Sequence, residues 1–216
     1  MTAAYTRAGR ARFGPSVSWG MAPAVLRRNS NVLLEITETV LLALLIFFGT
    51  RMVVQNFRVD GGSMVPVLEN GEFLLVNKLA YVAAKPDRGD VVVFRSPANP
   101  EEDLVKRIVG LPNETIEFHD GGVYVDGRRL DEDAYFPGVT APGRDRSLVV
   151  PEQGYFVLGD NRGQSIDSRR FRIVPEAAIV GKVWLVYWPV GSFGVLQGAT
   201  PGFEPAPERI SLLPAA

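Results

Sequence analysis

Residues 115–127 read Thr-Ile-Glu-Phe-His-Asp-Gly-Gly-Val-Tyr-Val-Asp-Gly, and this stretch decides the fold class. Two short β-forming runs, Thr115 to Phe118 and Val123 to Val125, flank the turn sequence Asp120-Gly121-Gly122. A second turn sequence, Asp126-Gly127, follows at once. Because glycine accepts positive φ without strain, both turns suit tight hairpins. The stretch therefore predicts antiparallel β-structure.

Similar short runs, punctuated by glycine and proline, recur on both sides of this hairpin. The other predicted strands are Phe73–Val76, Asp90–Phe94, Leu104–Val109, Gly154–Leu158 and Gly181–Tyr187. No segment after residue 56 shows a long apolar period of 3.6 residues. We therefore expect an all-β or mostly-β domain over residues 52–199, built from antiparallel sheets, and an extended C-terminal tail over residues 200–216.

A long apolar segment precedes this domain. Val32 to Thr50 contains an unbroken apolar run from Val40 to Phe48. As a helix, this segment would be about 28 Å long, close to the roughly 30 Å of a bilayer's hydrocarbon core. Glu35 and Glu38 fall near its amino end, where a carboxylate can stay in the interface. The pattern predicts a transmembrane helix over residues 31–51.

The basic residues around this segment predict its orientation. Residues 1–30 contain several arginines, including Arg27 and Arg28, and no acidic residue, whereas only Arg51 follows the segment closely. By the positive-inside rule, residues 1–30 form a cytoplasmic tail and the β-domain is exported, as in a single-pass protein of the cell (inner) membrane. A buried or interfacial helix is the alternative. A cleaved signal peptide fits less well, because no small-x-small site precedes Arg51.

The composition narrows the chemistry of the chain. It has 216 residues, no cysteine, one histidine and a net charge of −1. Disulfides, thiolate metal sites and a cysteine nucleophile are excluded, and His119 falls in a hairpin turn, where a histidine is usually solvated. The absence of a basic run argues against a nucleic-acid partner. We expect no metal, no cofactor and a monomer, and a hydrolase would need a base other than histidine.

Two segments carry candidate catalytic groups. Ser63 follows Gly61-Gly62 and precedes Pro66, in a turn where its backbone N–H can point outward, although serines in such turns are mostly structural. Lys106 shares a strand face with Leu104 and Ile108. Most strand lysines are exposed, but apolar neighbours make this one a candidate for burial, which lowers the pKa of a lysine. A neutral amine could then accept a proton from a serine hydroxyl.

A third segment, Gly159 to Arg169, is dense in Asp, Asn, Ser and Arg, which is typical of a polar turn packed by its own hydrogen bonds. Together and in this order, the segments resemble those of the bacterial type I signal peptidases, a family of Ser-Lys dyad proteases. The matching segments are Ser63-Met64-Val65-Pro66-Val67-Leu68, Gly89-Asp90-Val91-Val92-Val93-Phe94, Lys106 through Glu114 and Gly159 through Arg169. The resemblance covers about residues 32 to 190.

The resemblance implies the roles of the polar residues. Ser63 would be the nucleophile and its backbone N–H an oxyanion donor, Lys106 the general base, and Ser165 a hydroxyl that orients the lysine amine. Asp167 and Arg169 would form a supporting ion pair. Asp160 and Asn161 would support the loop. The implied fold is a β-rich catalytic domain of coiled antiparallel sheets.

The sequence departs from the family pattern at two places. Val67 stands where the family usually has threonine, which removes a hydroxyl near the nucleophile. Gly61 stands where some members have a hydroxyl residue that adds an oxyanion donor, so a second donor must be backbone or water.

The implied partners are exported preproteins with signal peptides, and the lipid bilayer. A signal peptide presents a small-x-small site just outside the bilayer, and we expect the extended substrate to pair with a strand edge. Val59 and Val105 are then candidates to shape the pockets for the small residues. Two alternatives remain open, a Ser-Lys self-cleaving repressor and an inactive homologue that binds exported proteins.

Overall fold

The computed structural model describes residues 24–132, 146–196, 198 and 201–204, with the backbone alone for residues 24–31. The chain divides into two compact units, residues 1–47 and 48–216. The first unit contains most of helix α1 (Ala24–Val53). The predicted tails over residues 1–30 and 200–216 lie largely outside the described residues.

Helix α1 has the character of a membrane span. Val32 to Val53 has a mean hydropathy of 2.2, and none of its most apolar window is buried in the protein. An apolar helix of 22 residues exposed on all sides is stable in a bilayer and not in water. The predicted apolar helix is confirmed.

In the part of the second unit that the structure describes, there are twelve strands and a few short helices. The strands are β1 (Val54–Arg58), β2 (Phe73–Asn77), β3 (Val91–Arg95), β4 (Asp103–Gly110), β5 (Thr115–His119), β6 (Gly122–Val125), β7 (Arg128–Arg129), β8 (Arg146–Val149), β9 (Gly154–Leu158), β10 (Val174–Pro175), β11 (Ile179–Trp188) and β12 (Gly194–Val195). The helices are η1 (Arg162–Gln164), α2 (Ser168–Phe171), η2 (Glu176–Ala178) and η3 (Val190–Ser192). The prediction of a mostly-β fold preceded by an apolar helix is confirmed.

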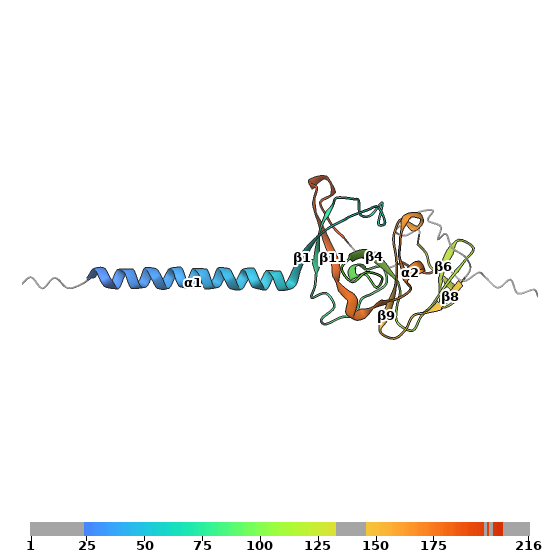
Figure 1. Ribbon diagram of the computed structural model, residues 1–216, viewed down its shortest axis with the longest axis horizontal. Coiled ribbons are helices and arrows are strands. Elements are labelled where there is room, and N and C mark those ends of the chain that lie inside the picture. The colour runs from blue at the N-terminus through green and yellow to red at the C-terminus, as the bar shows by residue number, and fades with distance from the viewer. Residues whose placement is uncertain (1–23, 133–145, 197, 199–200, 205–216) are drawn as a thin grey trace, which may run out of the picture. The chain divides into compact units, whose positions relative to one another are not determined.

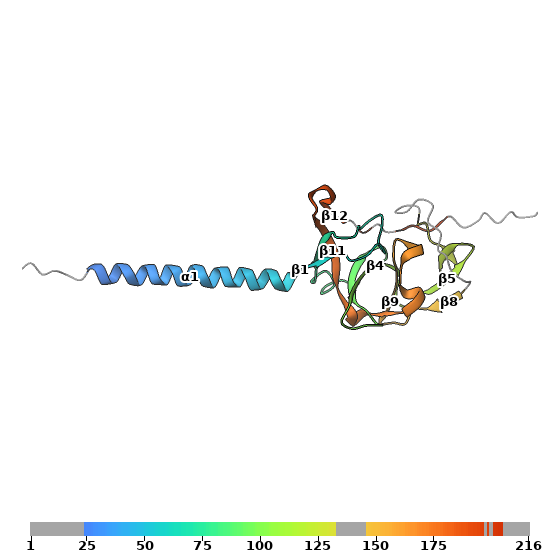
Figure 2. The ribbon, with the colours of Figure 1, turned by 45° about the horizontal axis from the view of Figure 1, so that its top comes forward.

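The strands form two sheets, and every pairing is antiparallel. The larger sheet has the order β1-β2-β11-β3-β4-β9-β10, with β12 beside β11. The smaller sheet has the order β7-β6-β5-β8. Both views place the smaller sheet at the end of this unit opposite β1, with β4 and β9 between them (Figures 1 and 2). Strand β4 therefore lies inside the larger sheet, which is where Lys106 is found.

The hairpin that predicted the fold class forms as expected. In the β5–β6 turn, Asp120 and Gly121 have φ of 52° and 71°, and in the β6–β7 turn, Asp126 and Gly127 have φ of 49° and 74°. Two consecutive residues with positive φ match the right-handed twist of the flanking strands. His119 stacks on Tyr124 with ring centroids 3.6 Å apart and lies at the surface.

The sequence patterns did not predict β7, β8, β10 and β12, and β1 was expected only as a strand ending near Val59. Strand β1 reads Val-Gln-Asn-Phe-Arg and is stabilised by pairing with β2 over all five of its residues. Its polar composition gives no alternation, so only the tertiary partner makes it a strand. Residues 201–204, placed in the tail by the sequence, include Phe203, which pairs with Leu130 and packs on the core of the smaller sheet.

The close approach of β11 to β2 depends on a glycine. A Cβ on Gly181 would lie 2.4 Å from the backbone oxygen of Asn77, so we expect Gly181→Ala to lower the free energy of unfolding by about 1–3 kcal/mol. A Cβ on Gly191 would meet nothing within 4 Å, so Gly191→Ala is the matched control. Thermal denaturation of the full chain in detergent measures both, and equal melting temperatures would contradict the packing argument.

Candidate active site

Ser63 lies in the turn between β1 and β2, and the turn is fixed from both ends. Gly61 has a φ of 93°, a conformation that favours glycine, and its N–H donates to Asn70 Oδ1 at 2.9 Å. Beyond the serine, Met64 and Leu68 are fully buried in the core. The buried side chains anchor the turn, while the glycine lets the chain reverse and present the Ser63 hydroxyl.

Lys106 lies on β4 and reaches this hydroxyl. Its Nζ is 2.6 Å from Ser63 Oγ and 2.9 Å from the carbonyl oxygen of Val105. The residue is only 3% exposed. Residues 43 positions apart in the sequence therefore form one hydrogen-bonded pair.

Burial changes the protonation of this amine. Loss of hydration lowers the pKa of Lys106 from 10.5 to about 8, although the negative charges of Asp167, Asp160 and Glu102 oppose the shift. A buried ammonium loses its water shell, so the neutral amine is favoured. With a pKa of about 8, about a tenth of the protein carries the neutral amine at pH 7, and this form can accept a proton from the neighbouring hydroxyl.

The loop after β9 packs against the Ser63 turn through its backbone. Asn161 donates from its N–H to the Ser63 carbonyl and from Nδ2 to the Gly62 carbonyl, both at 3.0 Å. A Cβ on Gly159 would lie 2.1 Å from Ser165 Oγ and 2.6 Å from the Ser63 carbonyl oxygen. Ser165 therefore lies beside the Ser63 turn. Its buried hydroxyl has no hydrogen-bond partner among the residues that the structure describes, Lys106 included.

Two ion pairs hold this loop in place. Asp160 accepts two hydrogen bonds from Arg107, at 2.9 and 2.8 Å, and burial raises the pKa of its carboxyl despite the arginine. Asp167 pairs with Arg169 at 2.8 Å and also accepts from the N–H of Gly159.

The protonation of Asp167 follows from these contacts. Burial acts to raise the pKa of its carboxyl, but the hydrogen bonds from Arg169 and Gly159 outweigh burial and lower it. The hydroxyl of Ser165 adds to the lowering, although its geometry falls short of a hydrogen bond. Asp167 is therefore a carboxylate at neutral pH.

The sequence missed part of this support. Arg107 pairs with Asp160, and the guanidinium of Arg162 pairs with Glu132 and donates from Nε to the Gly159 carbonyl at 3.1 Å. Both arginines and Glu132 are buried. In the sequence, a charged residue inside an apolar strand or next to a glycine turn indicates a buried ion pair. The sequence does not show which residue of opposite charge is its partner.

A cleft of about 350 Å³ opens beside the Ser63–Lys106 pair. Its two walls are the segment from Phe57 to Ser63 and the segment from Glu101 to Lys106. Val59 and Val105 both line it, as do Leu74 and Val93 from the floor of the sheet. Asp103 to Lys106 pair with β3 on one side, while β9 pairs only from Arg107 onward. The strand edge along the cleft is thus open to an extended peptide.

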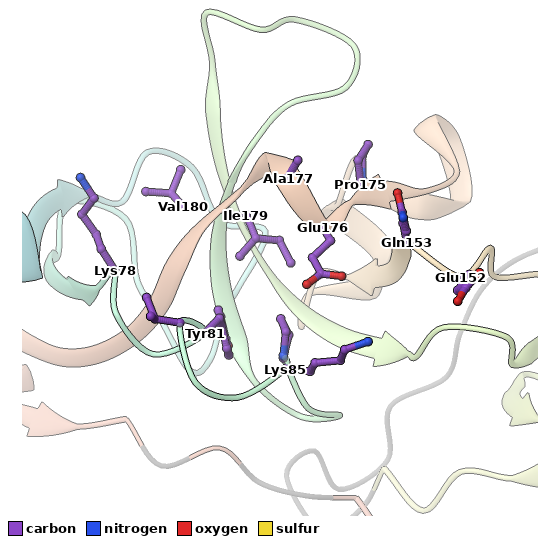
Figure 3. Close-up of a pocket in the computed structure, with 12 residues that line it drawn as sticks. Lys78, Tyr81, Lys85, Glu152, Gln153, Pro175, Glu176, Ala177, Ile179 and Val180 are labelled. Carbon is purple, nitrogen blue, oxygen red and sulfur yellow. The ribbon is translucent and has the colours of Figure 1, made fainter.

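A second, larger cavity lies elsewhere. It has a volume of about 660 Å³, and Figure 3 shows Tyr81 and Lys85 on one side of it and Pro175 and Glu176 on the other. Neither Ser63 nor Lys106 lines this cavity. Within the part of the chain that the structure describes, no group of three or more His, Cys, Asp or Glu side chains could hold a metal ion.

The site combines a serine hydroxyl with a buried lysine amine at hydrogen-bond distance, and an open strand edge lies beside them. This arrangement is typical of a serine hydrolase that acts on peptide substrates. Residues 33–188 match the family described as "Signal peptidase, peptidase S26". The chain belongs to this family of serine peptidases.

Individual relatives agree with this assignment. The chain is 41% identical over 153 residues to signal peptidase I of Bacillus caldolyticus, which covers 65% of this chain and 83% of the relative. It is 34% identical over 173 residues to probable signal peptidase I-2 of Synechocystis, and this match covers 77% of this chain and 78% of the relative. A crystal structure of a signal peptidase I from Enterococcus faecalis is 39% identical to this chain. The match covers 45% of this chain and 96% of that structure's chain, with a TM-score of 0.41.

Proposed function

We propose that this chain removes signal peptides from exported preproteins, with Ser63 as nucleophile and Lys106 as general base. Relatives of this family carry the name signal peptidase I. The observation that carries the residue roles is the 2.6 Å separation between Ser63 Oγ and the Lys106 Nζ, on an amine that is 3% exposed. All the proposed catalytic groups come from one chain, so one chain holds a complete site, and we propose a monomer.

In the first step, the Ser63 hydroxyl attacks the carbonyl carbon of the scissile bond while the Lys106 amine takes its proton. The C–O bond forms and leaves a tetrahedral oxyanion. When this intermediate collapses, the C–N bond breaks, and the Lys106 ammonium gives its proton to the departing amine. The products of this step are an ester on Ser63 and a free amino terminus.

In the second step, water replaces the leaving peptide and Lys106, again neutral, takes a proton from it. Attack on the ester releases the signal peptide as a carboxylic acid and regenerates Ser63. Two groups thus perform the roles that serine, histidine and aspartate share in a triad. An arginine at position 106 could not take part, because its guanidinium stays protonated.

We propose that Ser165 orients the Lys106 amine. A buried hydroxyl left without a partner costs about 1–3 kcal/mol. The neutral amine has two N–H groups, one of which can donate to the Ser165 oxygen while the single lone pair faces the Ser63 hydroxyl. Ser165 lies against the Gly159 and Ser63 backbones. A rotation of the hydroxyl toward the amine, as substrate excludes water from the cleft, would satisfy both groups.

We propose that the substrate extends along the open edge of β4, with Val59 and Val105 shaping the pockets for the two small residues. Both valines line the cleft next to Ser63. Branched side chains on either wall leave room for small side chains only. The inference for a small-x-small site therefore rests on the two valines that line the cleft.

We propose that residues 1–30 lie in the cytoplasm, that residues 31–51 cross the membrane, and that the catalytic domain over residues 52–199 lies on the extracytoplasmic face. The Lys78 N–H donates to the carbonyl oxygen of Val53, the last residue of the apolar span, at 2.9 Å. The catalytic unit therefore starts where the membrane ends. A short tether keeps the cleft at high local concentration near substrates in the same bilayer.

Removal of either member of the pair should stop cleavage. We expect Ser63→Ala and Lys106→Arg to lower kcat by about 10⁴-fold or more on a purified preprotein. Ser147→Ala and Lys85→Arg, at exposed positions, are the matched controls and should leave turnover unchanged. Cleavage by Ser63→Ala at the wild-type rate would rule out Ser63 as the nucleophile.

The rate should follow the protonation of Lys106. Because the base must be neutral and its pKa is about 8, kcat/KM should rise about tenfold per pH unit below pH 8 and level off above it. A bound substrate removes more water from the amine, so the inflection in kcat should lie at a lower pH. Stopped assays from pH 6 to 10 measure both, and a flat profile would exclude Lys106 as the base.

The orientation can be tested because the chain has no cysteine. Val82 is 76% exposed, so a Val82→Cys variant should react in intact spheroplasts with a maleimide that cannot cross membranes. A Thr6→Cys variant should react only after lysis. Labelling of residue 6 from outside would reverse the proposed orientation.

A further inference from the structure

The peptide bond between Gly62 and Ser63 carries the proposed oxyanion donor. In the described residues, no hydrogen-bond acceptor lies on the Ser63 N–H. A free N–H at the nucleophile can bind the oxyanion. A peptide unit is planar and trans, so this N–H points opposite to the Gly62 carbonyl. Whatever fixes the Gly62 carbonyl therefore fixes the direction of the donor.

Within the turn, only a long hydrogen bond of 3.3 Å, from the Val65 N–H to the Gly62 carbonyl, restrains this peptide among the described residues. Gly61 has a φ of 93°, and a Cβ on Gly62 would touch only Val65, at 3.7 Å. Two glycines in succession leave the backbone free to rotate, because no side chain clashes during the rotation. A rotated peptide would aim the Gly62 carbonyl oxygen at the oxyanion and repel it.

Asn161 opposes this rotation. Its Nδ2 donates to the Gly62 carbonyl at 3.0 Å, and its backbone N–H donates to the Ser63 carbonyl at 3.0 Å. A carbonyl oxygen only accepts hydrogen bonds, so the amide nitrogen must face Gly62. Asn161 precedes η1, yet its side chain makes no capping bond to that helix. The Asn161 side chain therefore binds the Ser63 turn and does not cap the helix of its own loop.

The two neighbours of Asn161 are held rigidly. Asp160 is bound by Arg107, and Arg162 is bound by Glu132 and by the carbonyl of Gly159. All four charged residues are buried. Asn161 is thus presented to the Ser63 turn by a segment that cannot easily move.

We propose that Asn161 is a positioning residue that holds the Gly62–Ser63 peptide with its N–H directed at the oxyanion. This inference rests on the proposed role of Ser63 as nucleophile. Asn161 acts only through the peptide and touches no reacting atom. Its contribution is made in the transition state, because the substrate carbonyl before attack needs the donor less than the oxyanion does.

The test replaces the amide by an isosteric carboxylate and by a methyl group. We expect Asn161→Asp and Asn161→Ala to lower kcat by about 10- to 10³-fold while KM changes less than about threefold. Asn161→Asp should be the slower variant, because its carboxylate repels the Gly62 carbonyl. The affinity for a peptide aldehyde, which forms a tetrahedral adduct on the serine, should fall in parallel with kcat/KM.

If Asn161 only stabilised the fold, its variants would not lower kcat selectively. The inflection of kcat/KM near pH 8 should remain in both variants, because Lys106 is untouched. Asn70→Asp is the control: Asn70 Oδ1 accepts from Gly61 at 2.9 Å, and aspartate keeps that acceptor, so kcat should stay at the wild-type value. Full kcat in Asn161→Asp, or an equal loss in Asn70→Asp, would overturn this inference alone. Cleavage by Ser63→Ala would overturn the proposed nucleophile and this inference with it.

Discussion

The Lys106 amine is 3% exposed and lies beside the Ser63 hydroxyl, and the surrounding structure is arranged to keep it from being paired with a carboxylate. Asp160 and Asp167 are close enough to raise its pKa, yet each is bound by an arginine of its own. A direct ion pair would hold the amine in its charged form. The arginines therefore allow burial to dominate, and the pKa of Lys106 falls to about 8.

Strand β4 buries two adjacent cations in two different ways. Lys106 and Arg107 point to opposite faces of the sheet, and both are nearly inaccessible to water. An arginine cannot lose its proton, so burial requires partners, and Arg107 finds Asp160 and the Gly89 carbonyl. A lysine can lose its proton, so Lys106 needs no counter-charge. The same burial that would destabilise an unpaired arginine lowers the pKa of the lysine, as the proposed role of general base requires.

Local patterns predicted the parts of the fold that local interactions determine. The hairpin at Asp120-Gly121 and strands such as β9 follow from turn residues and apolar runs, whereas β1 has neither signal and forms only because β2 pairs with it. The pairing of Ser63 with Lys106 came from a resemblance in ordered segments and not from spacing. The bond from Asn161 to Gly62 spans 99 positions. It depends on the direction of one peptide unit, which no residue pattern encodes.

The loop after β9 connects the two halves of the site. Asp160 binds Arg107, the neighbour of Lys106, and Asn161 binds the carbonyls of Gly62 and Ser63. Two consecutive residues thus contact the strand of Lys106 and the turn of Ser63. Glycines give that turn its shape but no rigidity. Since buried hydrogen bonds and ion pairs break only at a high cost, this loop adds rigidity to the glycine turn beyond the hydrogen bonds that the turn makes itself.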